Sequence, residues 1–505
     1  MLQHTDFDFI ERDKRENVTS RLAKNTFFLV VSRALGIFIT FGIVAVVARY
    51  LGIKLFGFYA LTTAIAMAIR PLMELGLDAI LCREISKERD NADLYVSSVI
   101  TMRIFLCCFI FVVSFIILKY YSSWDNTINL SILLAIICEM LLCIGMTCLS
   151  VIRAFEKMEY ELYCTTIRNV TSFIFILVVV FYNWGYLGIF YAKLFSSMVF
   201  LLFSALFLYG KFTKLLIRFS VSFSKFILKE SYPIAIFALL LSLIFKVDIF
   251  FLKLFGNIVD ISLYEVPHRL IVHTQVLPMA FVSSIFPLFS RTASRDSRNI
   301  LSNYYGNSSK LLWILGIPIS ALLLYGGEPL IITVFGEEFI KSIIAMNILA
   351  PTVMFLFLNS LQNFLLTSIG KQTLNLIGIT ISLIVNIILD TLLIPQYGYI
   401  GASIATLFSY LTLVLINSYF IAKHGIRTSN RTFVLKIVLS GVIMCTAAFI
   451  HAKNPMVGLM LRLCAGFTLY TISMLLLKTV SYEDIFMIKE IFLKKRYRKE
   501  FQPTI

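Results

Sequence analysis

A chain of 505 residues that is 59% hydrophobic and only 15% charged carries far more apolar surface than the core of one soluble globule could bury. The composition therefore excludes a soluble protein and indicates a chain that lies in a bilayer. The formal net charge of +16 is spread over separate short segments and forms no single basic face, so no nucleic-acid partner is expected.

Apolar runs of about twenty residues recur along the chain, each long enough as a helix to cross ~30 Å of hydrocarbon. They predict an all-α polytopic membrane protein with about 14 transmembrane helices. The first six predicted spans are 26–47, 56–80, 97–118, 128–151, 162–182 and 186–209. The next six are 233–255, 266–290, 310–333, 343–368, 373–395 and 399–421, and the last two are 433–450 and 456–477.

The orientation follows from the basic residues, because Lys and Arg that flank spans are retained on the cytoplasmic side. With the N-terminus inside, most basic loops fall inside; they carry Arg83, Lys87, Arg89, Arg153, Lys157, Lys211, Lys214, Arg218, Lys225, Lys229, Arg291, Arg295, Arg298, Lys423, Arg427 and Arg431. The other side receives Arg49, Lys54, Lys119, Lys341 and Lys453. This asymmetry predicts a multi-pass protein with both termini in the cytoplasm.

Two segments more than two hundred residues apart are variants of one motif, 184–196 (WGYLGIFYAKLFS) and 397–409 (YGYIGASIATLFS). Gly185 matches Gly398, and Gly188 matches Gly401. Duplicated halves in an apolar chain are typical of transporters in which one lobe moves against the other around a central site.

Charged residues inside the spans cost about 2.5 to 3.5 kcal/mol each on insertion scales and usually mark a pathway. We interpret four cations as substrate-binding residues of a cationic cavity: Arg33, Arg70, Lys246 and Arg269. Four titratable groups are candidates for ion or proton coupling: Glu74, Asp78, Asp248 and His273. Weaker candidates are Arg103, Glu139, Arg168, Lys193, Asp390 and Arg462.

The alternative for these charges is that they snorkel to the interface or neutralise one another. Arg70 and Glu74 are four residues apart, so they can pair along one helix face. The chain contains no P-loop, HExxH or GxSxG motif and no Cys or His set at metal spacing. We therefore expect no catalytic residues, no cofactor and no metal.

Three segments carry a family resemblance: 48–60 (ARYLGIKLFGFYA), 334–339 (VFGEEF) and 386–402 (NIILDTLLIPQYGYIGA). They resemble the polysaccharide transporters, similar to the Wzx O-antigen flippases, of the MATE-like MOP flippase superfamily. The resemblance implies two six-helix lobes, formed by a parallel internal repeat, plus two C-terminal helices. It also implies transport of undecaprenyl-pyrophosphate-linked oligosaccharide from the inner to the outer leaflet of the bacterial cytoplasmic membrane.

The implied partners are this lipid-linked oligosaccharide, membrane lipids, and the polysaccharide polymerase and chain-length machinery. The expected regions are a cytoplasmic N-tail (1–25), an N-lobe of helices one to six (26–210), a basic cytoplasmic loop (211–231), a C-lobe of helices seven to twelve (232–422), helices thirteen and fourteen (423–477) and a basic cytoplasmic C-tail (478–505).

Two alternatives remain open on the sequence. The chain could be a multidrug or lipid II exporter of the same superfamily. It could also be a membrane polysaccharide polymerase or ligase, although such an enzyme would need a large outside loop for its catalytic residues, and the longest outside connectors span only about ten residues.

Overall fold

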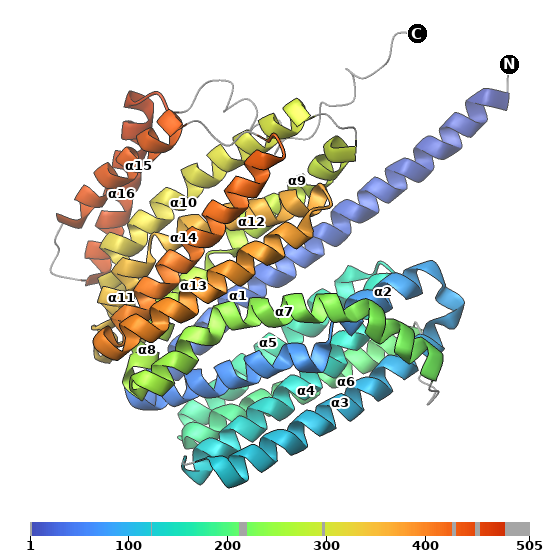
Figure 1. Cartoon of the computed structure of the whole chain (residues 1–505), viewed down its shortest axis with the longest axis horizontal. Coiled ribbons are helices and arrows are strands. Elements are labelled where there is room, and N and C mark those ends of the chain that lie inside the picture. The colour runs from blue at the N-terminus through green and yellow to red at the C-terminus, as the bar shows by residue number, and fades with distance from the viewer. Residues whose placement is uncertain are drawn as a thin grey trace. The chain divides into compact units, whose positions relative to one another are not determined.

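A computed structural model describes the backbone of residues 3–122, 124–211, 220–294, 298–426, 431–449 and 455–479, with side chains from Phe28 onward apart from single positions. Within these ranges the chain forms helices and no strands (Figure 1). The predicted all-α polytopic membrane fold is therefore confirmed. Most of the predicted C-tail lies outside the described residues, and the first helix begins at Gln3, within the predicted N-tail.

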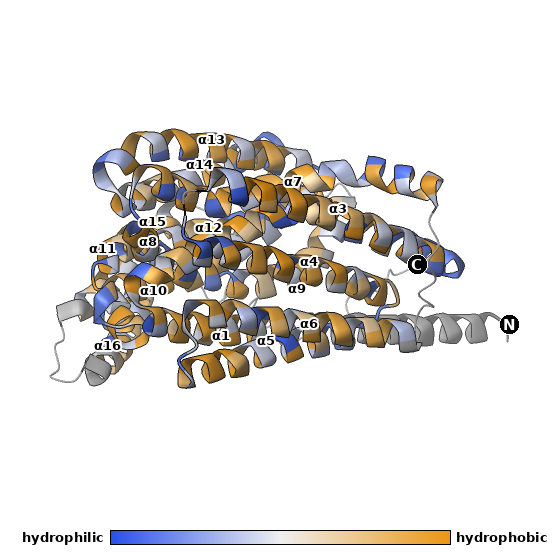
Figure 2. Cartoon of the chain, turned by 90° about the horizontal axis from the view of Figure 1, so that it is seen from below, coloured by the Kyte–Doolittle hydropathy of each residue, from blue (hydrophilic) through white to orange (hydrophobic). Residues whose placement is uncertain are grey.

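Ten described helices are long and apolar enough to cross a membrane, or eleven if one bent pair counts as a single span. The first of these contains two of the predicted spans, and two C-terminal helices are apolar but shorter, so the predicted count of 14 is approximate. Long stretches of the described helices are hydrophobic (Figure 2). Helices suit this environment because each satisfies its own backbone hydrogen bonds in lipid.

The chain divides into two compact units, residues 1–265 with 386–402, and residues 266–385 with 403–505. The residue bounds of these units differ from those of the predicted lobes, 26–210 and 232–422. The division into these two lobes stays a prediction. The difference has a local cause, because the helix after the basic loop packs with the first helices of the chain. In that packing the Ser242 hydroxyl donates to the Met67 carbonyl oxygen at 3.0 Å, and Arg83 pairs with Glu230 at 3.1 Å.

The first unit is built from long helices that pack side by side, with α4 against α6 and α5 against α1 and α6. Its elements are α1 (Gln3–Glu74), α2 (Leu77–Lys87), η1 (Arg89–Asn91), α3 (Ala92–Tyr121), α4 (Asn126–Ala154), α5 (Met158–Phe181), α6 (Gly185–Lys211), α7 (Val221–Phe255), the start of α8 (Ile258–His273) and the end of α13 (Gln372–Tyr397).

Gly52 interrupts α1 with non-helical backbone angles, φ 68° and ψ 175°. The predicted spans 26–47 and 56–80 lie on either side of this break. Five residues later, a side chain at Gly57 would collide with the carbonyl oxygen of Ile258. The absence of a Cβ at Gly57 therefore lets α1 approach the start of α8 closely.

The duplicated motif forms the same kind of turn twice. Gly185 has φ +72° between α5 and α6, and Gly398 has φ +55° between α13 and α14 (Tyr399–Lys423). Such a left-handed conformation favours glycine. A Cβ at Gly188 would lie 2.8 Å from the Val179 side chain, and one at Gly401 would lie 2.5 Å from the Leu393 carbonyl oxygen. Each second glycine therefore permits close packing of a helix against the end of the helix that precedes it.

The second unit contains the rest of α8, most of α13 and α14, and the remaining helices of the chain. Those helices are α9 (Val276–Ser294), α10 (Arg298–Phe335), η2 (Glu337–Phe339), α11 (Ser342–Leu349), α12 (Thr352–Ser368), α15 (Arg431–Cys445), η3 (Thr446–Phe449) and α16 (Pro455–Leu476). Here α10 packs against α12, α15 and α16.

One predicted span, 266–290, is broken between α8 and α9 at Thr274 and Gln275. Pro278 explains the break, because it has no backbone N–H to continue a helix from Thr274 and fits the first turn of a new one. Pro267 lies inside α8 without ending it.

Candidate functional site

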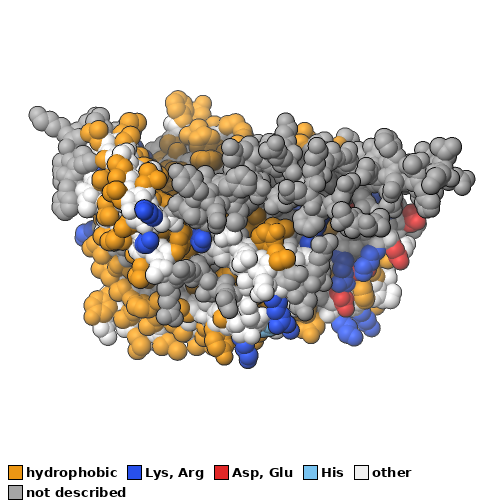
Figure 3. All heavy atoms as spheres, turned by 90° about the horizontal axis from the view of Figure 1, so that it is seen from above, with side chains coloured by type: hydrophobic (Ala, Val, Ile, Leu, Met, Phe, Trp, Pro, Cys, Tyr) orange, Lys and Arg blue, Asp and Glu red, His pale blue; other side chains and the backbone are white. Residues whose placement is uncertain are grey.

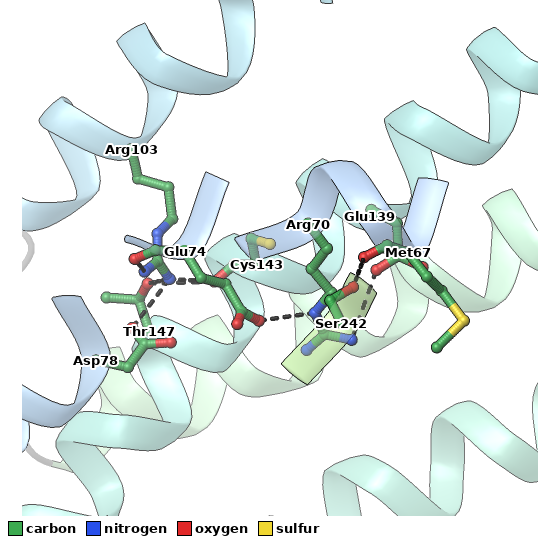
Figure 4. A network of polar contacts seen from close by, with 9 residues as sticks. All are labelled: Met67, Arg70, Glu74, Asp78, Arg103, Glu139, Cys143, Thr147 and Ser242. Carbon is green, nitrogen blue, oxygen red and sulfur yellow. Dashed lines mark hydrogen bonds and ion pairs between the residues drawn. The ribbon is translucent and has the colours of Figure 1, made fainter. Parts of the chain in front are cut away.

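Charged side chains of α1 to α4 meet inside the first unit (Figure 4). Arg70 Nε donates to Glu74 Oε1 at 2.7 Å, which confirms the pairing predicted along one helix face. The other end of the guanidinium lies 3.5 Å from Glu139 Oε2 on α4. The Arg70 side chain is 31% exposed.

Arg103 on α3 is fully buried and joins four helices (Figure 4). Its Nη1 donates to Asp78 Oδ1 of α2 at 2.9 Å, to the Cys143 carbonyl oxygen of α4 at 2.6 Å and to the Thr147 hydroxyl. Its Nη2 donates to the carbonyl oxygen of Glu74, the last residue of α1, at 3.1 Å. This geometry gives Asp78, predicted as a coupling residue, a partner that holds helices together.

Two further cations lie near Glu139, whose carboxylate interacts electrostatically with Arg70, Arg168 and Lys193. Arg168 on α5 donates to Asn169 Oδ1 at 3.0 Å. Lys193 on α6 places its ammonium 4.3 Å from the centre of the Tyr59 ring, a cation–π arrangement. With Glu74, this group combines three cations with two carboxylates, and we call it the Arg70 cluster.

Arg33 on α1 is exposed and makes no ion pair with another described residue. Its neighbour Ser32 exchanges a hydrogen bond of 2.7 Å with Thr165 of α5. Arg33 therefore lies beside the helix that carries Arg168.

Lys246 on α7 is nearly buried and donates to Glu265 Oε1 of α8 at 3.0 Å, where the Glu265 side chain is 0% exposed. The predicted cation thus has a buried counter-ion. Arg269 and His273, the other predicted residues of α8, belong to the second unit and are half-buried within it.

Asp248, also on α7, lies in a second polar group of the first unit. Its Oδ2 accepts from the Tyr264 hydroxyl at 2.8 Å, and its Oδ1 accepts from Asn386 Nδ2 of α13 at 3.0 Å. Asp390, one helical turn after Asn386, lies close enough to Asp248 for the two carboxylates to interact. Neither oxygen of Asp390 has a hydrogen-bond donor among the described residues.

This carboxylate pair has a clear chemical consequence. Both Asp248 and Asp390 are at most 1% exposed. Two neighbouring carboxylates in a buried site strongly disfavour being charged together, so a proton or a bound cation has to compensate one of them. On the sequence, Asp390 is only a weaker candidate for a functional charge. Its spacing of four residues from Asn386 nevertheless places both side chains on one face of a helix.

Most of the described charged side chains lie on the surface, and few are buried. On the face in Figure 3, Lys and Arg side chains form small groups between broad hydrophobic areas. Arg83 exemplifies such a surface group, since it pairs with Glu84 at 2.7 Å and with Glu230 while its side chain stays 42% exposed. The Arg70 cluster and the group around Asp248 differ from such surface pairs because they contain buried or half-buried charges inside the unit.

Comparison with known families gives one match that covers more than half of the chain. The family described as polysaccharide biosynthesis protein matches residues 22–293. The matched region includes the Arg70 cluster, Lys246 and Asp248.

Two curated relatives are archaeal. The chain is 22% identical over 238 residues to the probable low-salt glycan biosynthesis flippase Agl15 of Haloferax volcanii, covering 46% of this chain and 50% of that protein. It is 28% identical over 217 residues to an uncharacterized membrane protein of Methanocaldococcus jannaschii, covering 42% of this chain and 41% of that one. The chain thus spans about half the length, or less, of these relatives.

Two solved structures share the fold. The lipid II flippase MurJ in an inward closed conformation has a TM-score of 0.75 at 18% identity, with 92% of this chain and 100% of that chain covered. A multidrug resistance MATE family transporter of the MOP superfamily, in an inward-facing conformation, has a TM-score of 0.63 at 16% identity, with 77% of this chain and 95% of that chain covered. The fold that the resemblance implies is therefore confirmed.

Proposed function

Because this chain belongs to the polysaccharide biosynthesis protein family, we propose that it is a flippase for undecaprenyl-pyrophosphate-linked oligosaccharide, such as an O-antigen repeat unit. It moves this lipid from the inner to the outer leaflet of the bacterial cytoplasmic membrane by alternating access, with both termini in the cytoplasm. Polysaccharide polymerase and chain-length machinery are proposed as the proteins that act on the product. In this proposal the chain is a transporter and not an enzyme.

The Arg70 cluster is the observation that carries the proposal. A pyrophosphate that crosses the bilayer needs cations inside the membrane, where inserting a charged side chain costs free energy. The first unit holds three such cations around Glu139 in its apolar spans: Arg70, Arg168 and Lys193. Arginine can offer two parallel donors to a phosphate, whereas lysine offers a point charge. The pyrophosphate would compete with Glu74 and Glu139 for Arg70, so binding rearranges pairs that already exist.

Arg33, Lys246 and Arg269 remain proposed members of the cationic path. Arg33 is exposed, which suits early contact with the substrate. Lys246 would take part only after exchange of its buried Glu265 partner. Polar side chains of the path would contact the sugars, while the polyprenyl chain stays in lipid.

Asp248 and Asp390 are the proposed coupling groups. A proton or Na⁺ bound between them would remove the repulsion of two buried carboxylates, and Tyr264 and Asn386 would hold Asp248 in place. Release of that ion would restore the repulsion and favour another arrangement of α7 and α13. Glu74, Asp78 and His273 stay proposed as secondary coupling groups.

The test uses proteoliposomes that contain the purified chain and a fluorescent lipid-linked oligosaccharide in both leaflets. We expect Arg70→Gln to slow flipping strongly and Arg70→Lys to restore part of the rate, since the charge returns without the bidentate geometry. Arg83→Gln is the matched control, because Arg83 also pairs with two glutamates but lies on the surface. Equal rates for the parent and Arg70→Gln would contradict the role of the cluster.

The same vesicles separate the proposed substrate from the alternatives. Lipid II and a cationic dye replace the oligosaccharide lipid in parallel assays. Faster transport of either one than of the oligosaccharide lipid would refute the proposed substrate and would identify the chain as a lipid II or multidrug exporter.

A further inference from the structure

The second unit contains a cavity of about 350 Å³ where the ends of five helices meet. This volume lies at the lower end of small-molecule sites, which span roughly 300–1,000 Å³. The cavity lies between the end of α9, the start of α10, the α12–α13 turn and the end of α14; its lining residues are Ser290, Thr292, Ala293, Arg298, Leu301, Ser368, Ile369, Lys371, His424 and Ile426. All of them belong to the second unit.

The lining of this cavity is basic. Arg298, Lys371 and His424 come from three different helices or turns, and no Asp or Glu occurs among the described lining residues. Thr292 and Ser368 donate their hydroxyl protons to backbone carbonyl oxygens of their own helices. The three basic side chains carry the side-chain N–H donors of the described lining, and Ser290 adds a hydroxyl group.

A simpler role for these cations would be to cap the carbonyl groups at the ends of α12 and α14. The backbone already does this at both ends. After α12, Lys371 N donates to the Leu366 carbonyl oxygen at 2.7 Å, and after α14, Ile426 N donates to the Ile421 carbonyl oxygen. His424 does use Nδ1 on the Phe420 carbonyl oxygen at 2.9 Å, which leaves Nε2 for other partners. Backbone N–H groups and one ring nitrogen of His424 thus cap these two helix ends.

The backbone brings the basic side chains together. Gly370 and Gly425 have φ +70° and +78°, so both turns use left-handed glycines. A Cβ at Gly425 would lie 4.0 Å from Arg298 Cδ, which places the Arg298 side chain along the α14 turn. Lys371 directly precedes α13, whose first backbone N–H groups and helix dipole add positive potential.

We propose that this cavity binds a phosphate group. Arginine, lysine and a helix N-terminus form a strong phosphate-binding set, and the absence of a described lining carboxylate favours a dianion or diester over a cation. The basic loops here are predicted to be cytoplasmic, where anionic lipids create a negative surface potential. The phosphate can therefore come from the headgroup of an anionic phospholipid or from a free phosphate compound. The inference does not depend on the proposed substrate.

The test measures the thermal denaturation midpoint of the purified, delipidated full chain in a neutral detergent. Phosphatidylglycerol, phosphatidylcholine and inorganic phosphate are titrated separately, because a ligand that binds the folded state raises the midpoint. We expect phosphatidylglycerol or inorganic phosphate to raise it, and phosphatidylcholine to have a smaller effect. A response to phosphatidylglycerol alone assigns the site to a lipid headgroup, and a response to inorganic phosphate assigns it to a soluble phosphate compound.

Variants connect the response to the cavity. Each of Arg298→Gln and Lys371→Gln is expected to weaken binding by roughly tenfold, because each removes one charge-assisted donor. Lys423→Gln is the matched control, since Lys423 is exposed next to His424 but does not line the cavity. Native mass spectrometry of retained lipid gives a second measurement if a variant is less stable. The proposal is wrong if neither phosphate source raises the midpoint, or if Lys423→Gln weakens binding as much as the cavity variants do.

Discussion

Arg103→Met should destabilise the first unit more than any surface charge removal, because Arg103 joins α1, α2, α3 and α4 through one buried guanidinium. The variant removes its bonds to Asp78, Thr147 and the carbonyl oxygens of Cys143 and Glu74. Breaking a buried ion pair by removing one partner typically costs 3–5 kcal/mol, and we expect about 3 kcal/mol here. The lower figure applies because the Asp78 side chain is 21% exposed and water can solvate part of its charge.

The assay is thermal denaturation of the purified protein in detergent, followed by circular dichroism. By the scaling for single domains, the loss corresponds to a fall of roughly 5–10 °C in the midpoint. The double variant Arg103→Met with Asp78→Leu should recover much of the loss, because it leaves no buried charge unpaired. Arg83→Met, the exposed control, should not shift the midpoint measurably. Arg103→Met could instead denature at the same midpoint as the parent but abolish transport. That result would place Arg103 in the substrate path and would refute its structural role.

Four other predictions concern topology, the cationic path, energetics and coupling. A cysteine at the exposed Glu338 should react with an impermeant thiol reagent from the periplasm, whereas one at the exposed Ser222 should not; labelling of Ser222 in sealed cells would overturn the orientation. Arg269→Ala should abolish surface polysaccharide, measured on cell extracts, while the protein stays inserted and abundant. Arg269→Lys should restore export only in part. Full export by the alanine variant would exclude Arg269 from the cationic path. A head group with about two negative charges gains roughly 2.3 kcal/mol per charge per 100 mV on moving outward. Proteoliposomes should therefore flip the lipid-linked oligosaccharide faster under an inside-negative potential. A rate that follows only a proton or Na⁺ gradient would contradict this prediction. Asp390→Asn should uncouple flipping from that ion gradient, seen as a rate independent of pH or Na⁺, and a variant that keeps the parent's dependence would exclude Asp390 as a coupling group.

Features that depend on composition or on neighbours along one helix could be predicted from the sequence. The apolar runs predicted an all-helical membrane protein, and the spacing of four residues predicted the contact of Arg70 with Glu74. The duplicated motif predicted two like halves, and the structure adds that Gly185 and Gly398 both adopt the left-handed conformation.

Contacts between distant helices could not be predicted in the same way. Asn386 and Asp248 are 138 residues apart, and nothing in either span indicates that they meet. Glu265 directly precedes the predicted span 266–290, yet it is fully buried against Lys246. Such pairs follow from how helices pack, which the periodicity of one helix does not encode. Arg168 and Lys193 were only weaker candidates on the sequence for the same reason, because their common neighbour Glu139 lies on another helix.

The two left-handed glycine turns also bear on how the similarity between the duplicated segments is preserved. A left-handed turn favours glycine over other residues, whereas a membrane-facing helix surface accepts any residue that is apolar enough. After a duplication, replacements are therefore expected to be rarer at Gly185 and Gly398 than along lipid-facing helix surfaces. Backbone geometry thus favours glycine in both copies, and related chains should retain their internal symmetry at these two positions longer than at lipid-facing ones.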